Sequence, residues 1–253
     1  QGGFAGSPGL RPEKGESWTA GAVFTPRFLP GFSLFADYID VEVKNLIIPT
    51  TLSNAAQFCY DSPTFNDTSA QLGVNTCTFF SRAAMTSGGT TQFNIQNGFA
   101  SGFINLGALK VRSLNAGFTY AFDLANLFGG KEGSRFTLTG NAYRLFDYIQ
   151  SASGRFDDSQ NSAGSFFRPK LETQLTGRFE NDSLFAQWTW NWQKKTRLFN
   201  ANTGAFATIE NQDVIDFPAF SLHDASFGLK VADRFVLQFT VRNVFDKNYA
   251  GLR

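Results

Sequence analysis

The chain of 253 residues carries 22 Lys and Arg against 21 Asp and Glu, a balance without the basic excess that would indicate nucleic-acid binding. Only 17% of its residues are charged, against roughly 25% in an average soluble domain, and its single histidine excludes a His-rich metal site. No apolar run approaches the roughly 20 residues of a membrane-spanning helix. Yet the 30 Phe side chains need an apolar environment. These features favour a transmembrane β-barrel over a soluble β-sandwich or propeller, which would use Val and Ile more than Phe.

Alternation of apolar with small or polar residues is the dominant pattern along the chain, and it predicts an all-β, antiparallel fold. In one clear example, Trp188 and Trp190 share a face with apolar neighbours, whereas Thr189 and Asn191 lie on the opposite face. The predicted strands, in chain order, cover residues 17–25, 32–47, 104–122, 135–149, 170–180, 184–195, 221–231 and 235–243.

The connections between these eight strands alternate between short and long. The shorter set covers residues 26–31, 123–134, 181–183 and 232–234. The longer set covers residues 49–102, 150–169, 196–219 and the segment after 243. Outer-membrane barrels have this asymmetry, with short periplasmic turns and long outer loops. A soluble sandwich has no reason to sort its loops in this way.

One face of the predicted sheet is apolar enough to contact lipid. The residues expected to face lipid are Leu114, Phe118, Leu171, Leu175, Trp188, Trp190, Leu237 and Phe239. The row formed by Trp188, Trp190 and Trp192 is typical of an aromatic girdle at the membrane interface, and packing in a protein core is its alternative.

Several segments of the chain resemble TonB-dependent outer-membrane receptors, in the order in which that family has them. The C-terminal box, with Asn243, Phe245, Asp246 and Tyr249, resembles the end of the penultimate strand of the family's barrel. The other matching segments are residues 10–17 (LRPEKGES), 35–47 (FADYIDVEVKNLI), 105–114 (NLGALKVRSL, with Ser113 where Gly is usual) and the Cys59 and Cys77 segments.

The resemblance implies a piece of a barrel of about 22 strands that surrounds a plug. Residues 1–253 would form a partial barrel domain in the bacterial outer membrane, with the plug and the final strand absent from the chain. We therefore expect an open sheet with two unpartnered edge strands.

The implied activity is energised uptake of a scarce nutrient, a ferric siderophore or alternatively a carbohydrate or another nutrient, rather than an enzymatic reaction. The implied partners are membrane lipid, lipopolysaccharide, a small nutrient molecule, and TonB through an upstream region; no cofactor is implied. An independent eight-stranded barrel, enzymatic or structural, is the alternative.

The only two cysteines, Cys59 and Cys77, lie in one polar stretch of the longest predicted loop. They match an outer-loop cysteine pair found in one branch of the family, and an oxidising compartment favours their pairing. We expect a disulfide, and two buried thiols are the alternative.

Ligand contacts in such a barrel are expected from the outer loops, where charged and aromatic side chains gather. Alternatively, these charged and aromatic side chains simply form solvated loop surface. The candidates are Arg155, Asp157, Asp158, Phe166, Phe167, Arg168, Lys194, Lys195, Arg197, Phe199 and Phe206.

The sequence contains no clear catalytic constellation. Ser221, His223 and Asp224 allow a catalytic triad on paper, but a strand residue near the membrane interface is the better interpretation of the only histidine.

Overall fold

The computed structural model describes residues 9–49, 51, 102–124, 133–151, 154–156, 159, 161–197, 216–231 and 235–248. Contacts divide the chain into two compact units. The first comprises Gln1–Glu16, Val41–Lys110 and Ile149–Gln160, and the second comprises Ser17–Asp40, Val111–Tyr148 and Asn161–Arg253. The described residues contain no helix that is long and apolar enough to cross a membrane.

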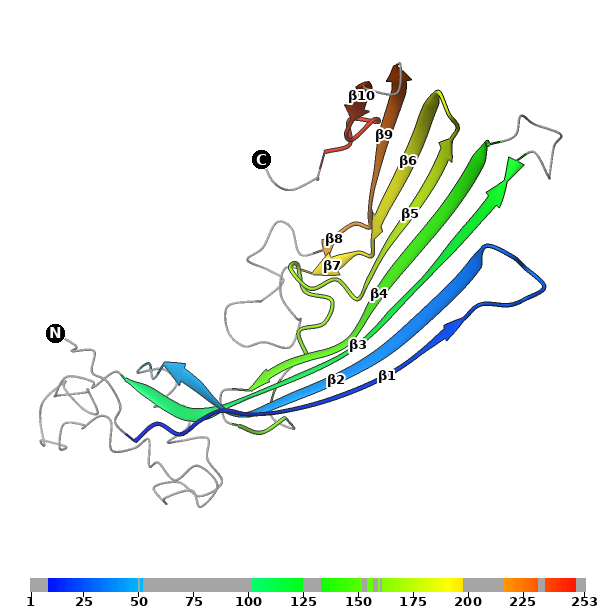
Figure 1. Ribbon diagram of the computed structural model, residues 1–253. Helices are drawn as coiled ribbons and strands as arrows, with labels where there is room; N and C mark the ends of the chain where they lie inside the picture. The colour runs from blue at the N-terminus through cyan, green and yellow to red at the C-terminus, as the bar shows by residue number, and fades with distance from the viewer. Residues whose placement is uncertain are drawn as a thin grey trace, which may run out of the picture. The chain divides into compact units, whose positions relative to one another are not determined.

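Eight long strands form one sheet, and all eight correspond to strands expected from the alternation. Their bounds are β1 (Lys14–Phe24), β2 (Phe32–Pro49), β3 (Phe103–Asp123), β4 (Arg135–Ser151), β5 (Leu171–Glu180), β6 (Leu184–Gln193), β9 (Phe220–Val231) and β10 (Phe235–Val241). The sheet order is β1-β2-β3-β4-β5-β6-β9-β10, so neighbours in the chain are neighbours in the sheet (Figure 1). The all-β antiparallel class is therefore confirmed.

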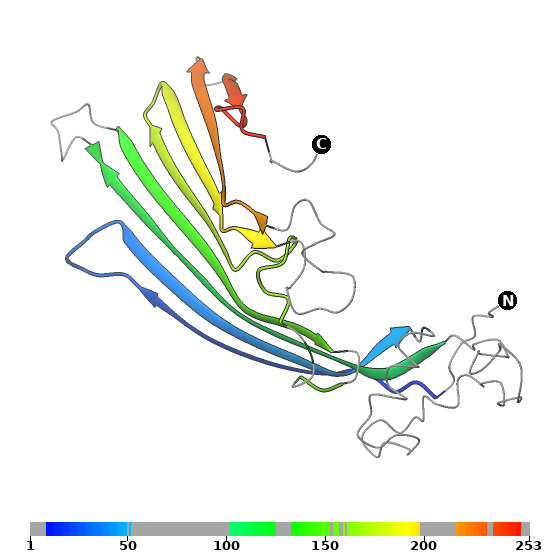
Figure 2. The same cartoon turned by 180° about the vertical axis from the view of Figure 1, so that it is seen from behind.

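A short hairpin interrupts this order within the predicted loop 196–219. It pairs β7 (Thr196–Arg197) with β8 (Asp216–Phe217) in a separate two-stranded sheet, and the view from behind shows the same arrangement (Figure 2). Alternation could not have revealed this hairpin, because each of its strands has only two residues.

The register places the apolar halves of neighbouring strands on one face of the sheet in the second unit. Phe239 of β10 is opposite Phe227 of β9, and Trp190 of β6 is opposite Leu175 of β5. On the same face, the Phe118 side chain of β3 occupies the space where Gly140 of β4 lacks a Cβ. Because side chains alternate with a period of two, the polar halves share the other face.

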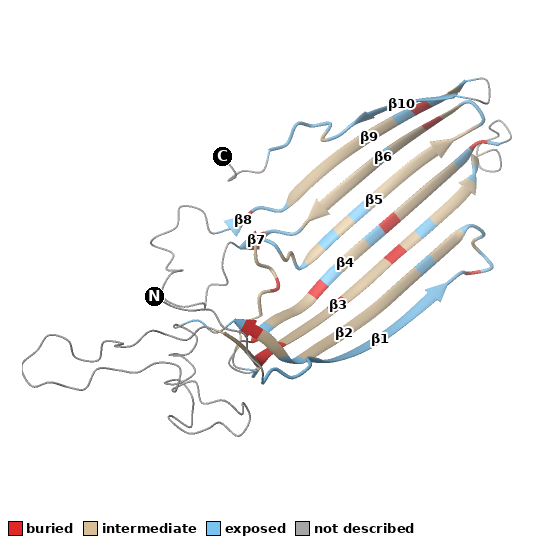
Figure 3. Cartoon of the chain, turned by 60° about the vertical axis from the view of Figure 1, so that its left-hand side comes forward, coloured by how far each residue is buried: buried red, intermediate tan, exposed pale blue. Residues whose placement is uncertain are grey.

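The sheet in the second unit is open, as expected. Its order begins at β1 and ends at β10, and no ladder joins these strands among the residues that the structure describes. Both edges are exposed along their whole length, whereas the central strands are mostly half-buried (Figure 3). Apolar side chains on these edges include Trp18 at 60% exposure and Phe239 at 64%.

Candidate functional site

The polar face of the second unit carries hydrogen-bonded pairs of side chains that run across the strands. Thr176 and Thr189 have their hydroxyl oxygens 3.2 Å apart. Gln174 Nε2 donates to Asn191 Oδ1 at 2.8 Å, and Asn191 Nδ2 lies 3.5 Å from Asp224 Oδ2. These side chains come from β5, β6 and β9, so the face is a continuous polar surface rather than a set of isolated groups.

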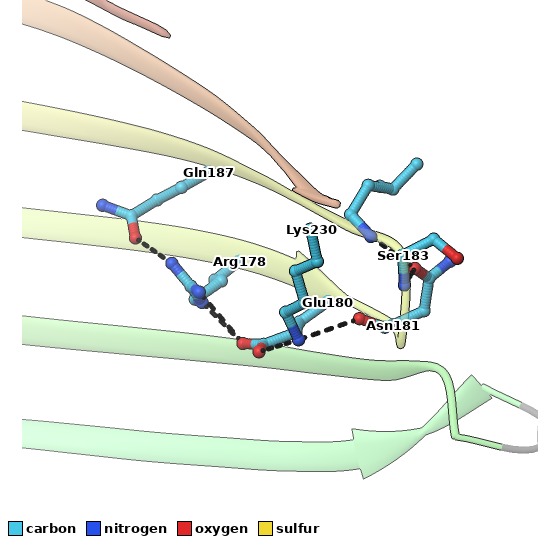
Figure 4. Close-up of polar contacts among 7 residues, drawn as sticks. Arg178, Glu180, Asn181, Ser183, Gln187 and Lys230 are labelled. Atoms are coloured by element: carbon cyan, nitrogen blue, oxygen red, sulfur yellow. Dashed lines mark hydrogen bonds and ion pairs between the residues drawn. The ribbon is translucent and has the colours of Figure 1, made fainter. Parts of the chain in front are cut away.

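A charged network lies on this face beside the tight β5–β6 turn (Figure 4). The Glu180 carboxylate accepts from Arg178 Nε and from Lys230 Nζ, each at 3.0 Å. Arg178 also donates to Gln187 Oε1 at 3.3 Å, and Lys230 Nζ donates to the Asn181 carbonyl at 3.1 Å. One carboxylate thus bridges two cations that come from different strands.

The side chain of Asn181 stabilises the tight turn at residues 181–183, which the sequence predicted as a short connection. Asn181 Oδ1 accepts from the backbone N–H groups of Ser183 at 2.9 Å and Leu184 at 2.8 Å. A short amide side chain that bonds to the following backbone is the reason that Asn favours turns. The turn therefore fixes the Asn181 carbonyl that Lys230 uses.

At the opposite end of these strands, part of the loop after β4 is folded onto the β7–β8 hairpin. The ring of Phe166 lies 4.4 Å from that of Phe217, which is only 5% exposed. The Arg197 N–H donates to the Gly164 carbonyl at 2.9 Å, and Arg197 Nε forms an ion pair with Asp216 Oδ1 at 2.7 Å. At this end of the sheet, ring contacts, a backbone hydrogen bond and an ion pair thus hold the loop against the hairpin. We call residues 161–170 together with β7 and β8 the loop cluster.

Asn161 anchors the start of the loop cluster. Its Oδ1 accepts from the backbone N–H groups of Tyr148 at 3.0 Å and Ala163 at 2.9 Å. Its Nδ2 donates to Asp147 Oδ1 at 2.6 Å and to the Phe146 carbonyl at 3.2 Å. Sequence reasoning missed this residue, because a lone Asn in a polar loop gives no signal of so many contacts.

The structure brings together four of the predicted ligand-contact residues. Phe166, Phe167, Arg168 and Arg197 all lie in the loop cluster, but they are not equally available. Phe166 and Arg197 are held by the contacts just described, whereas Phe167 is 86% exposed. The Arg168 guanidinium lies over the Tyr148 ring, 4.0 Å from its centroid.

The other predicted contacts are distributed differently. Lys194 and Lys195 are exposed just beyond β6, and the Lys194 N–H donates to the Leu171 carbonyl at 2.9 Å. Arg155 is exposed in the first unit. Seven further residues of interest lie outside the described part of the chain: the candidates Asp157, Asp158, Phe199 and Phe206, the expected disulfide partners Cys59 and Cys77, and Tyr249 of the C-terminal box.

The described part of the C-terminal box forms a structured turn. Asn243 and Asp246 have positive φ angles of 52° and 48°, which short polar side chains tolerate better than most. The side chain of Asn243 accepts from the Lys247 N–H and donates to the Lys247 carbonyl, each at 3.0 Å. Asp224 Oδ1 accepts from the Asn243 N–H at 2.8 Å. The turn is thereby fixed to β9.

These contacts contradict a catalytic triad. Asp224 bonds to the Asn243 backbone, while His223 Nδ1 receives the indole N–H of Trp188 at 3.2 Å instead of a carboxylate contact. Of the two candidate partners in such a triad, Ser221 has its Oγ 3.3 Å from His223 Nε2, while Asp224 is engaged by the Asn243 backbone. Among the described residues, no three His, Cys, Asp or Glu side chains gather in a way that could hold a metal ion.

In the first unit, Glu42 of β2 lies between two lysines. Its carboxylate contacts Lys44 Nζ at 2.8 Å and Lys110 Nζ at 3.7 Å. The hydrogen bond from Lys44 is the main cause that holds the pKa of Glu42 below its usual value, and the charge of Lys110 adds to it. The same hydrogen bond raises the pKa of Lys44.

The sequence matches the family described as "TonB dependent receptor-like, beta-barrel" over residues 1–244, and the chain belongs to this family. The family consists of outer-membrane receptor barrels, which agrees with the resemblance found in the sequence. No curated protein sequence matches closely enough to be named as a relative.

Solved structures agree with this fold. The siderophore receptor PirA from Acinetobacter baumannii is similar with a TM-score of 0.59 at 12% identity, over 96% of this chain and 29% of that one. The ferric enterobactin receptor PfeA from Pseudomonas aeruginosa, solved as a mutant with enterobactin, has a TM-score of 0.57 at 14% identity, over 96% and 28%. The FrpB iron transporter from Neisseria meningitidis has a TM-score of 0.54 at 12% identity, over 97% and 29%. The chain thus spans less than a third of the length of each of these proteins.

Proposed function

We propose that this chain forms part of the wall of an outer-membrane, TonB-dependent receptor that imports a ferric siderophore. The observation that carries the proposal is the division of the sheet into one apolar and one polar face. A sheet with lipid on one side and a wet lumen on the other needs this division. In this arrangement Leu175 and Phe239 contact lipid, while the Glu180 network lines the lumen.

The loop cluster supports the choice of ligand class. It offers an exposed aromatic ring at Phe167, and the next residue in the chain, Arg168, has its guanidinium 4.0 Å from the centroid of the Tyr148 ring. Catecholate iron chelates are anionic and aromatic, so an arginine can attract their charge and a phenylalanine can stack against their rings. A neutral sugar can accept hydrogen bonds from the arginine, but it carries no net negative charge for the guanidinium to attract. The similar solved structures, which are an iron transporter, a siderophore receptor and a ferric enterobactin receptor, favour the same class.

The remaining partners follow from this function. Lipid and lipopolysaccharide would cover the apolar face, and TonB would act through a region outside residues 1–253. The open edges at β1 and β10 would pair with further strands, because unpaired backbone groups are costly in lipid. An isolated eight-stranded barrel is less favoured, since its interior must be filled by side chains. The polar face here instead carries small and hydrated groups such as Thr176 and Thr189.

The test is equilibrium binding of ferric catecholate chelates to the full-length protein in detergent, followed by uptake into cells with and without the proton-motive force. We expect Phe167→Ala and Arg168→Ala each to weaken binding roughly tenfold, about 1.4 kcal/mol. Phe28→Ala is the matched control, because Phe28 is equally exposed, at 84%, but lies in the β1–β2 turn. Tight binding of a neutral sugar, with no binding of any iron chelate, would contradict the proposed ligand class.

A further inference from the structure

The only histidine of the chain is the centre of an aromatic cluster on the apolar face. Trp188 Nε1–H donates to His223 Nδ1 at 3.2 Å, and Trp190 Nε1–H donates to Ser221 Oγ at 2.6 Å. The ring of Phe245, from the C-terminal box, meets the His223 ring edge-on with centroids 4.9 Å apart. Both indole N–H groups therefore have partners within the sheet.

These contacts give each ring nitrogen of the histidine a polar partner. An indole N–H can only donate, so Nδ1 is the acceptor of the Trp188 contact. Nε2 lies 3.3 Å from Ser221 Oγ, which is close enough for a hydrogen bond. His223 and Ser221 thus form one connected set of partners for the two tryptophans.

The position of the cluster along β6 is unusual for membrane tryptophans. A strand that crosses a bilayer has about 9–11 residues, and β6 runs from Leu184 to Gln193, so Trp188 is its fifth residue and Trp190 its seventh. Tryptophans in an aromatic girdle sit at the headgroups, where their N–H groups find polar partners. Trp188 and Trp190 do not need such partners, because His223 and Ser221 already supply them.

We infer that Trp188 and Trp190 lie against lipid acyl chains at hydrocarbon depth, and that His223 and Ser221 are the internal hydrogen-bond acceptors that make this position possible. Of the three tryptophans expected in the girdle, only Trp192, the ninth residue of β6, is then placed at the headgroups. The inference rests on the proposed function, in which the apolar face contacts lipid. The occupant is lipid acyl chain, because the side chains that the cluster itself exposes are aromatic: Trp188 is 41% exposed and Phe245 57%.

The test measures tryptophan depth in the full-length protein, reconstituted in phosphatidylcholine vesicles. The vesicles carry bromine either near the ends of the acyl chains or near the headgroups, because bromine quenches nearby indole fluorescence. The fluorescence that disappears in Trp188→Phe or in Trp190→Phe is the component contributed by that tryptophan. Bromine near the ends of the acyl chains should quench these two components most. The fluorescence component that disappears in Trp192→Phe should be quenched most by bromine near the headgroups. Preferential quenching of the Trp188 component by shallow bromine would overturn the inference.

Substitution of the histidine tests its role as a partner. His223→Leu removes the acceptor, so the Trp188 indole should move toward the headgroups and its quenching should shift from deep to shallow bromine. His223→Asn is the matched control, because its Oδ1 can take the place of Nδ1, and deep quenching should be retained. Ser221→Ala should shift Trp190 alone, and it provides a second measurement if His223→Leu fails to fold. Unchanged depth in the folded variants would sink the proposed role of His223 and Ser221.

A separate measurement distinguishes this inference from the function on which it rests. A cysteine at Phe118, on the same face, should resist an aqueous maleimide in the reconstituted protein. Ready labelling there would overturn the lipid-facing assignment of the whole face, and with it the proposed function. Protection at Phe118 combined with a shallow Trp188 would overturn only the inference about depth.

Discussion

The guanidinium of Arg178 lies over the ring of Phe185, 4.2 Å from its centroid. Phe185 is an apolar side chain on the otherwise polar face, and it is only 7% exposed. Its ring fills the space above Gly228 of the neighbouring β9 and supports the arginine that binds Glu180. One aromatic ring thus connects the packing of the sheet to its charged network.

This relationship predicts that Gly228→Ala destabilises the protein. A Cβ at this position would overlap the Phe185 ring, and the resulting overpacking costs typically about 1–3 kcal/mol. Gly15→Ala is the control, because a Cβ at Gly15 in β1 meets nothing within 4 Å. Denaturant unfolding of the full-length protein, followed by the heat-modifiable shift on gels, measures both variants. Equal stability of the two variants would show that the ring moves aside freely.

The charged network itself should contribute modestly. Glu180→Gln removes the carboxylate that Arg178 and Lys230 share, but these side chains are between 34% and 41% exposed, so solvent screens them. We expect a loss of about 0.2–1 kcal/mol that shrinks in high salt. A double-mutant cycle with Lys230→Met isolates the pair. A loss that is large and independent of salt would contradict a screened ion pair.

A pH dependence should arise at Glu42. The lysine hydrogen bond lowers the pKa of this carboxylate in the folded state, so its contribution to stability is present above the ordinary value of 4.5. That contribution is lost as the pH falls through the lowered pKa, because the proton then enters the folded state. The stability difference between the wild type and Glu42→Gln should therefore disappear in acid.

The two lysines beside Glu42 provide an internal comparison. Lys44→Met should raise the pKa of Glu42 more than Lys110→Met does, because the Lys44 hydrogen bond is the largest cause of the shift. Titration of the Glu42 carboxyl by NMR in each variant measures this order. The reverse order would mean that the 3.7 Å contact of Lys110 dominates over the 2.8 Å contact of Lys44.

Asn161→Ala should loosen the loop cluster. The substitution leaves the backbone N–H groups of Tyr148 and Ala163 without their amide acceptor, and unsatisfied groups of this kind cost about 1–3 kcal/mol. We expect faster hydrogen exchange over 161–170 with little change in β5. Ser162→Ala is a neighbouring control. Unchanged exchange in Asn161→Ala would show that Phe166 and Phe217 hold the loop without the amide.

Much of the fold could be predicted from the sequence, because alternation and register reinforce each other over long strands. Phe239 and Phe227 illustrate this, since each was apolar in its own strand and the register places them opposite one another. Phe185 and the β7–β8 hairpin could not be predicted. Phe185 breaks the alternation to fill the space above Gly228. The hairpin joins two-residue strands that are far apart in the sequence, where Arg197 pairs with Asp216. The loop candidates were found by composition alone, which cannot distinguish the anchored Phe166 from the exposed Phe167.

The assignment of the two faces can be decided at Phe118 and Thr119, adjacent residues of β3 on opposite faces. Phe118 packs over Gly140 on the apolar face, so a cysteine there should be shielded by lipid from an aqueous maleimide. Thr119 is exposed on the polar face, and a cysteine there should be labelled readily through the lumen. Leu175 and Thr176 of β5 repeat the comparison on a second strand, with the same expected difference. Because side chains alternate strictly along each strand, an error would reverse both pairs together. Labelling at Phe118 and Leu175, with protection at Thr119 and Thr176, would place the lumen on the apolar face.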